Sequence, residues 1–338
     1  MTVINGIEID DAYTFRNETT EAIRNNDPLD ILHVIMVISN PCQFARRYIL
    51  AKQFRQRMEE TPNILLYIVE LAYGDQKFHV SDSRNKRHLQ IHGDVPVWHK
   101  ENMINMGVKL LPQNWKAMAW IDADIEFDSP SWALDTLKIL NGSKDIVQLF
   151  GHIVNMDRNE DATDIFPGFG FQYMKKREYG GIDINHWHPG YAWACTRKAY
   201  DKMGGLYQSN ILGAGDLNMA LSLIGNSVKS LDKDATSDYK NSLEEFQRKA
   251  SGLRLGYVPG VIRHYFHGSK KNRKYLELAV ILAHHKYEPS KHIMLRSDGL
   301  LIPTSSCPQK LLDEILNYFA ERNEDESYKT DLLSPQDW

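Results

Sequence analysis

Four long runs of apolar residues divide the first half of the chain. The first run, residues 31–39, is continuous, rich in β-branched side chains, and stops at Asn40 and Pro41. A continuous apolar run of this length predicts a strand that is buried on both faces, as in a parallel sheet. The same pattern predicts three further strands, over residues 63–74, 116–127 and 145–153.

Segments with helical spacing of apolar residues lie between these runs. Residues 44–60 contain no helix breaker, and residues 100–111 show the same spacing. Alternating strands and helices predict an α/β fold with a mostly parallel central sheet flanked by helices. Further along, we expect a polar, Gly-rich loop at 155–186 and helices within 226–252, 275–286 and 309–322.

Composition and charge exclude several classes of protein. The 338 residues include 40 Lys and Arg against 44 Asp and Glu, a net charge of −4, which argues against blanket neutralisation of nucleic-acid phosphates. The longest uncharged stretch, 31–45, is shorter than the roughly 20 apolar residues of a membrane span, and the N-terminus lacks a signal-peptide pattern. The cysteines are too scattered for a disulfide framework or zinc site: Cys42, Cys195 and Cys307. We therefore expect a cytoplasmic protein without a membrane span.

The segment WIDADIEF places Asp122 and Asp124 at the end of a predicted buried strand. Residues i and i+2 of a strand point to the same face, and two carboxylates about 4 Å apart repel by about 4 kcal/mol at an effective dielectric of about 20. A divalent ion that also binds a diphosphate would relieve this repulsion, and oxygen ligands suit Mg²⁺ or Mn²⁺. A solvated turn without a ligand is the alternative.

A second candidate segment, residues 261–275, contains two histidines three apart and then a basic cluster. His264 and His267 could complete a metal shell that favours Mn²⁺. The cations Lys271 and Arg273 could hold phosphate oxygens. Ordinary packed or surface histidines are the alternative.

Two further segments combine glycine with acidic or aromatic residues. In LGAGDLNMA, Asp216 follows a Gly-x-Gly turn, so it is either a helix cap or a general base on a loop. In the segment 185–200, aromatic side chains interleave with glycine and histidine, which suits stacking on sugar rings as well as an aromatic core patch. The candidates are Trp187, His188, Tyr191 and Trp193.

Together, in this order, the segments WIDADIEF, HPGYAWA, GAGDLNMA and HYFHGSKKNRKY resemble metal-dependent glycosyltransferases of the GT-A (nucleotide-diphospho-sugar transferase) fold. The likeness extends over about residues 31–301, and the segments resemble a group of bacterial, phage and large-virus glycosyltransferase-like proteins. HYFHGSKKN is also similar to the metal-binding stretch of β-1,4-galactosyltransferases. Those enzymes carry a Glu-Asp pair in the acceptor loop, whereas Gly215 stands here in place of the Glu.

The resemblance implies a nucleotide-sugar donor, UDP-linked, and a role for each candidate. Asp124, His264 and His267 would bind Mn²⁺ (or Mg²⁺), and Asp122 would contact the donor ribose or metal-bound water. Asp216 would deprotonate the acceptor hydroxyl, giving inversion. The other donor-binding candidates are Ser39, Asn40, Arg47, Glu70, Lys100, Asn105, Lys271 and Arg273.

The resemblance therefore implies a glycosyltransferase that acts on a glycan, glycoconjugate or protein acceptor. Two alternatives remain: a catalytically silent nucleotide- or sugar-binding module of the same fold, and an enzyme that glycosylates modified DNA. The expected organisation is a lead-in at 1–28, a transferase domain at 29–301 with a nucleotide-sugar half (29–154) and an acceptor and metal half (155–275), and a C-terminal helix with an acidic tail at 302–338.

Overall fold

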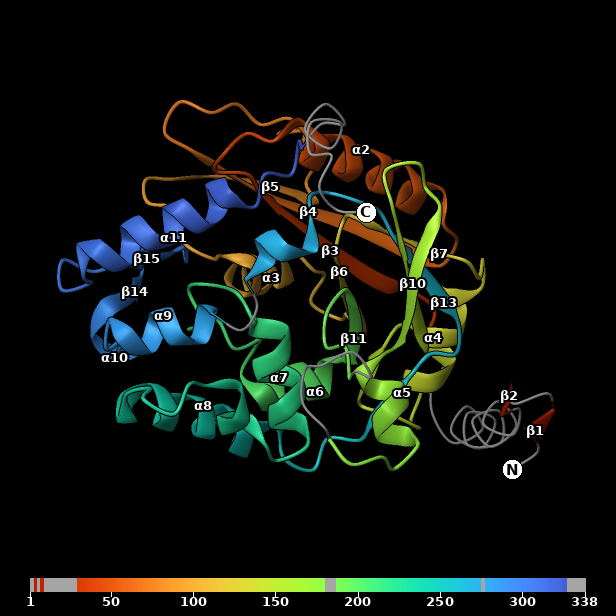
Figure 1. Cartoon of the computed structure of the whole chain (residues 1–338). Coiled ribbons are helices and arrows are strands. Elements are labelled where there is room, and N and C mark those ends of the chain that lie inside the picture. The colour runs from red at the N-terminus through yellow and green to blue at the C-terminus, as the bar shows by residue number, and fades with distance from the viewer. Residues whose placement is uncertain (1–2, 5–6, 9–28, 180–186, 275–276, 327–338) are drawn as a thin grey trace, which may run out of the picture.

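The computed structural model of the chain describes residues 3–4, 7–8, 29–179, 187–274 and 277–326. Its centre is a seven-stranded sheet with strand order β12-β8-β11-β6-β3-β4-β5 (Figure 1). Every pair is parallel except the two pairs made by β11, so the predicted α/β fold with a mostly parallel sheet is confirmed. In this order the strands are Leu255–Tyr257, Ile146–Gln148, Ala192–Thr196, Ala117–Ile121, Leu32–Ser39, Ile64–Tyr73 and His88–Gly93.

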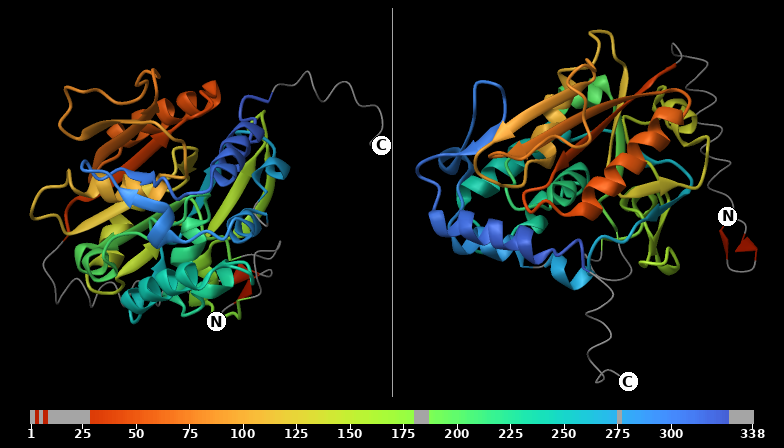
Figure 2. Two further views of the ribbon diagram at one scale, coloured as in Figure 1. Left: turned by 90° about the vertical axis from the view of Figure 1, so that its left-hand side faces the viewer. Right: turned by 90° about the horizontal axis from the view of Figure 1, so that it is seen from above.

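Helices cover both faces of this sheet, because the buried strands are apolar on both sides. Val34 of β3 packs in the core with α2 (Ala45–Glu60) and α4 (Trp132–Leu140), whereas Ile35 packs on the opposite side. Figure 2 shows α2 lying along its face of the sheet. The other face carries α3 (Lys100–Val108), α6 (Arg197–Met203), α7 (Gly215–Leu223) and α8 (Ser237–Ala250).

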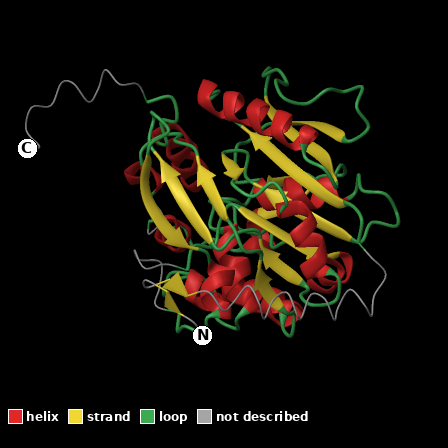
Figure 3. Ribbon diagram, turned by 90° about the vertical axis from the view of Figure 1, so that its right-hand side faces the viewer, coloured by secondary structure: helices red, strands yellow, loops and turns green. Residues whose placement is uncertain are grey.

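A second, four-stranded sheet lies beside the first, in the order β10-β9-β13-β7 (Figures 1 and 3). Its strands are Ala162–Pro167, His152–Met156, Val261–His264 and Ile125–Phe127. Strands β6 and β7 belong to different sheets, although only residues 122–124 separate them. The single strand predicted over 116–127 is therefore wrong, and the strand predicted over 145–153 likewise divides into β8 and β9.

The predicted loop at 155–186 is largely structured. Strands β9 and β10 form an antiparallel pair, and α5 (Phe169–Met174) follows; residues 180–186 lie outside the described part. Sequence reasoning missed this hairpin because its turn residues and glycines mask short strands. Within 226–252, a 3₁₀ turn (Ser227–Ser230) precedes α8.

The C-terminal part packs against the α3 side of the molecule. Its elements are α9 (Leu278–His284), α10 (Pro289–His292), β14 (Ile293–Leu295), β15 (Leu301–Pro303) and α11 (Gln309–Glu321). Strands β1 (Val3–Ile4) and β2 (Ile7–Glu8) form a separate pair near the N-terminus. Among the described residues, the helices are all too short or too polar to cross a bilayer.

Candidate functional site

The pairing of β7 with β13 joins two segments that are far apart in sequence. His264, the last residue of β13, lies opposite Ile125 of β7. The backbone N–H of Tyr265 donates to the carbonyl of Asp124 at 2.8 Å. The chain then turns, so that His267 also faces Asp124. The sheet register therefore places the aspartate and both histidines at one point.

Asp124, His264 and His267 form a cluster that could hold a metal ion. Oδ2 of Asp124 lies 2.8 Å from Nε2 of His267 and 4.0 Å from Nε2 of His264, and the two Nε2 atoms are 3.1 Å apart. All three ligand atoms lie within 4.8 Å of one another. One carboxylate and two imidazoles form a donor set that suits Mn²⁺ better than Mg²⁺.

His264 is held in the orientation and protonation state that a metal ligand requires. Its Nδ1 donates to Oδ1 of Asn155, on β9, at 2.9 Å, so Nε2 presents its lone pair toward Asp124. Burial lowers the pKa of His264 to about 3, although the charge of Asp124 acts in the opposite direction. The ring is therefore neutral at physiological pH, as metal coordination demands.

The environment of Asp124 also shows whether the cluster suits a metal ion. Burial alone would raise the pKa of Asp124, but His267, then His264 and Arg273, hold it well below its usual value. Its Oδ1 is buried and has no hydrogen-bond partner among the described residues. Leaving a buried acceptor unpaired costs about 1–3 kcal/mol, and a cation would remove that cost. The cluster therefore fits a divalent ion.

A second charged group, around Lys100, lies next to this cluster. The Nζ atom of Lys100 is 2.7 Å from Oδ1 of Asp122 and 2.9 Å from Oδ2 of Asp216. Burial would lower the pKa of Lys100, but these two carboxylates raise it well above its ordinary value. Burial raises the pKa of Asp122 to about 6, with Lys100 opposing. The ammonium thus holds Asp122 and Asp216 together.

The two aspartates of WIDADIEF do not face a single cation. Strand β6 ends at Ile121, so the strand geometry that would point both side chains the same way does not extend to them. Asp122 instead contacts Lys100, and Asp124 contacts His267. The expectation of a shared orientation is corrected, whereas the roles proposed for the two residues stay predictions.

Asp216 lies in the first turn of α7, after a sharp backbone turn. Gly213 and Ala214 both have left-handed φ values, 97° and 64°, and Ala214 is the N-cap residue. Asp216 is therefore not the cap, and its carboxylate is directed to Lys100. An ideal Cβ at Gly190 would lie 3.8 Å from Oδ2 of Asp216, so the 188–191 turn borders the same carboxylate.

The four aromatic candidates separate into two pairs. Trp187 and Trp193 are buried in the core around Phe169. His188 and Tyr191 are half-buried and stack with ring centroids 4.6 Å apart. The Tyr191 ring also lies 4.8 Å from the His264 ring. The stacked pair therefore adjoins the Asp124–His264–His267 cluster, whereas the two tryptophans lie in the core. Contact of these aromatic side chains with an acceptor stays a prediction.

The strand-end candidates bind mainly to the protein itself. Glu70 accepts hydrogen bonds from the backbone N–H groups of residues 79–81 and from the Ser81 hydroxyl. Asn40 forms a reciprocal pair of bonds with the backbone of Phe44. The Ser39 hydroxyl lies 3.1 Å from that of Tyr73. Their contact with a nucleoside stays a prediction.

The helical candidates are also engaged. Arg47 bonds both oxygens of the buried Glu324, at 2.8 and 2.5 Å, and the carbonyl of Ser39. Asn105 bonds Leu206, Gln208 and Tyr200, which ties α3 to the 206–208 loop. Donor contacts of Arg47 and Asn105 stay predictions.

The two cationic candidates after β13 differ in burial. Arg273 is buried, and its Nη2 donates to the carbonyl of His267 at 2.9 Å and lies 2.9 Å from Nδ1 of the same residue. Lys271 is exposed at the surface of the 3₁₀ turn Lys270–Arg273. Arg273 therefore holds His267 in place, and donor contacts of Arg273 and Lys271 stay predictions.

Sequence reasoning missed three residues of this site. Asn155 orients His264, Glu101 lies beside the Asp216 loop, and Glu324 has its Oε2 3.6 Å from Nδ1 of His267. Asn155 and Glu324 reach the site through tertiary pairing and give no local pattern. Glu101 could have been found from the sequence, because it directly follows Lys100, a donor-binding candidate, in the predicted helix 100–111.

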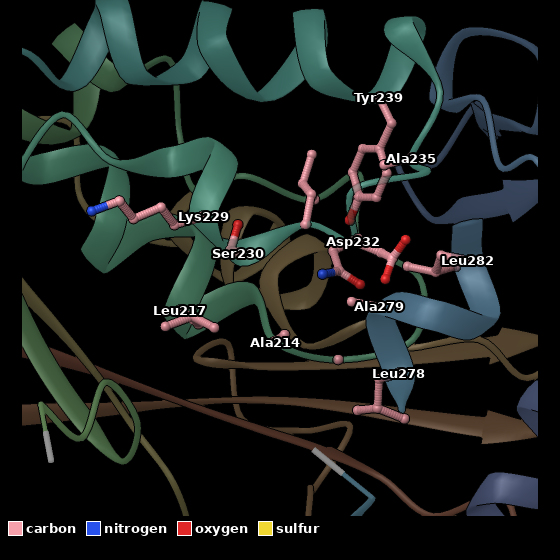
Figure 4. A pocket seen from close by; sticks show the side chains of 13 residues that line it. Ala214, Leu217, Lys229, Ser230, Asp232, Ala235, Tyr239, Leu278, Ala279 and Leu282 are labelled. Atoms are coloured by element: carbon pink, nitrogen blue, oxygen red, sulfur yellow. The ribbon is translucent and has the colours of Figure 1, made fainter. Parts of the chain in front are cut away.

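A cavity of about 220 Å³ lies behind the Asp216 loop, between α7, α8 and α9. Gly213 and Ala214 form one wall, and apolar side chains including Leu278 and Leu282 form another. Figure 4 shows the Tyr239 ring projecting into it. The cavity contains none of the predicted metal, donor or acceptor residues, so it is separate from the site around Lys100.

Solved structures that match the chain include glycosyltransferases and sugar-phosphate synthases. A Drosophila β1,4-galactosyltransferase 7 mutant in complex with manganese, UDP-Gal and xylobiose aligns with 84% of this chain and 98% of its own, at 12% identity and a TM-score of 0.38. Mannosyl-3-phosphoglycerate synthase from Rubrobacter xylanophilus covers 85% and 93%, at 10% identity and 0.37. Glucosyl-3-phosphoglycerate synthase from Mycobacterium tuberculosis, in complex with Mg²⁺ and UDP, covers 82% and 86%, at 10% and 0.33.

Comparison by sequence finds no matching protein-family model and no matching curated protein.

Proposed function

We propose that the chain is a divalent-metal-dependent glycosyltransferase that moves a sugar from a nucleotide-sugar, UDP-linked, to an acceptor hydroxyl. One observation carries the proposal: the Asp124–His264–His267 cluster lies beside a carboxylate, Asp216, that is held by Lys100. A metal site next to a positioned base combines the two groups that transfer from a diphosphate to a hydroxyl requires. The donor class comes from the sequence resemblance.

Asp124, His264 and His267 would hold Mn²⁺ or Mg²⁺. When bound, the ion supplies positive charge against the leaving diphosphate. Asn155 keeps Nε2 of His264 directed at the cluster, and Arg273 buttresses His267. The chain's own contribution on this side is to preorganise the ligands, so that binding does not have to order them.

Asp216 is the proposed base of an inverting transfer. Its Oδ2 accepts from Nζ of Lys100, which leaves Oδ1 as the oxygen that can take the acceptor's proton. Lys100 also holds Asp122, so the base is fixed relative to the end of β6. The stacked rings of His188 and Tyr191 offer a flat surface beside this point, where an acceptor or donor sugar could lie.

The test is release of UDP from a panel of UDP-sugars with Mn²⁺. Asp216→Asn should lower turnover by about 10²–10⁴-fold, the range for a positioned base, while nucleotide binding is retained. Asp124→Ala should make UDP binding independent of Mn²⁺. Asp313→Asn, an exposed change on α11, is the matched control. If the wild-type protein binds UDP but forms no free UDP from any of the UDP-sugars, it is instead a silent binding module.

A further inference from the structure

The side chain of Glu101, on helix α3, reaches the loop that carries Asp216. An ideal Cβ built on Gly215 would lie 2.1 Å from Oε1 of Glu101 and 2.2 Å from its Cδ. Real Cβ atoms essentially never approach other atoms so closely, so a side chain at position 215 would force the Glu101 carboxyl out of the space that it fills. Glycine at 215 therefore brings a carboxyl from another helix to within one residue of the proposed base.

Glu101 differs from the other buried glutamates of the described chain in its bonding. Glu70 is saturated by the 79–81 backbone and Ser81, and Glu324 by Arg47 and Arg322. Glu101 is 5% exposed, and neither of its carboxylate oxygens has a hydrogen-bond partner among the described residues. Buried polar groups are almost always bonded, so an unpartnered carboxyl beside a base indicates a ligand.

The charges around Glu101 determine what it can bind. Burial, followed by the charge of Asp216, raises the pKa of Glu101 to about 8, and Lys100 acts in the opposite direction. This shift favours the protonated carboxyl, which can both donate and accept a hydrogen bond. A hydroxyl group has the same dual capacity, so it is a matched partner for this carboxyl.

We propose that Glu101 hydrogen-bonds the acceptor, at a hydroxyl next to the one that Asp216 deprotonates. This inference rests on the proposed function and adds the class of acceptor to it. The two carboxyl groups border adjacent backbone positions, 215 and 216, so together they match two hydroxyls on neighbouring carbons. A sugar or another polyol has that arrangement, whereas the side chain of a serine or threonine offers a single hydroxyl.

The inference is tested by ligand-observed NMR with methyl pyranosides and their monodeoxy analogues. The proteins are wild type, Glu101→Gln, Glu101→Leu and Glu245→Gln, the last an exposed control on α8. We expect wild type and Glu245→Gln to bind at least one pyranoside, and loss of one hydroxyl to weaken this binding about tenfold. Glu101→Leu should bind the parent about tenfold more weakly and no longer distinguish it from that deoxy analogue.

A second variant and a stability measurement separate binding from structure. Glu101→Gln keeps the shape and has both a donor and an acceptor, so it should retain most of the binding. Thermal unfolding of Glu101→Leu should occur at or above the wild-type temperature, because the leucine replaces an unsatisfied polar group. If Glu101→Leu unfolds below the wild-type temperature, its binding result is set aside and Glu101→Gln is used instead. Weak pyranoside binding by Glu101→Gln overturns the proposal.

Three other outcomes would also overturn it. They are equal binding of parent and deoxy pyranosides by wild type, unchanged discrimination by Glu101→Leu, and binding of a Ser/Thr peptide but no pyranoside. Binding of UDP with Mn²⁺ to the wild-type protein is measured separately. Failure of that binding would reject the proposed transferase, whereas the pyranoside result would still show whether Glu101 lies in a polyol site.

Discussion

Nε2 of His267 lies 2.8 Å from Oδ2 of Asp124, at a point where Nε2 of His264 also converges. Because an ion bound only by the folded state stabilises it by about 2.7 kcal/mol at 100 times its Kd, saturating Mn²⁺ should raise the unfolding temperature by several degrees. His267→Ala should remove most of this shift. Differential scanning fluorimetry with and without EDTA measures it.

A matched control is available on the surface of α9 and α11. His284, His285 and Glu314 form another group whose ligand atoms lie within 4.8 Å, but His284 is exposed and His285 already pairs with Glu314 at 2.8 Å. His284→Ala should leave the Mn²⁺ shift unchanged. If the Mn²⁺-induced rise in unfolding temperature is lost in His284→Ala and kept in His267→Ala, the metal site lies at α9 instead.

Removing Lys100 should destabilise the protein more than removing a surface lysine. Lys100→Met leaves Asp122 and Asp216 facing each other without a counter-charge. Breaking a buried pair costs about 3–5 kcal/mol, and we expect a smaller loss here because these carboxylates are 27% and 21% exposed. Lys138→Met breaks an exposed i,i+3 pair and should cost at most about 1 kcal/mol. Equal losses in urea unfolding would contradict the ion triplet.

The sequence was most informative where burial is continuous. β3 and β4 follow from unbroken apolar runs, and α2 from helical spacing. The break after Ile121 could not be predicted, because apolar residues continue on both sides of 122–124 and the periodicity does not change. Strand β11 was missed because AWACT is short and its partners, β6 and β8, are distant in sequence.

The candidate site shows the same division. Asp124, His264 and His267 could be named from residue type and spacing, and the structure brings them together. Asn155 could not, because its contact with His264 depends on the parallel register of β9 and β13. The tryptophans of the 185–200 segment were ambiguous for the opposite reason: a core and a sugar platform use the same side chains.

The close approach of Gly215 and Glu101 predicts a pair of mutations whose effects do not add. Gly215→Ala should cost about 1–3 kcal/mol, the usual range for overpacking, because the new Cβ collides with the Glu101 carboxyl. In a Glu101→Ala background the same change should cost little, because the space is then empty. A double-mutant cycle in urea measures the coupling. Purely additive losses would show that the two residues are not in contact.

Acid should lower the free energy of unfolding through His99, the buried residue at the start of helix α3. His99, the residue before Lys100, is buried, its Nε2 lies 2.8 Å from the carbonyl of Leu301, and burial lowers its pKa to about 4 despite that contact. The unfolded chain, with a His pKa of about 6.5, binds the proton first, so stability is present above that pH and falls by about 3 kcal/mol as pH decreases toward 4. His99→Gln should flatten this part of the pH profile of urea unfolding, whereas His92→Gln, at an exposed position, should leave it as steep. An equally steep fall in His99→Gln would assign the acid sensitivity to other groups.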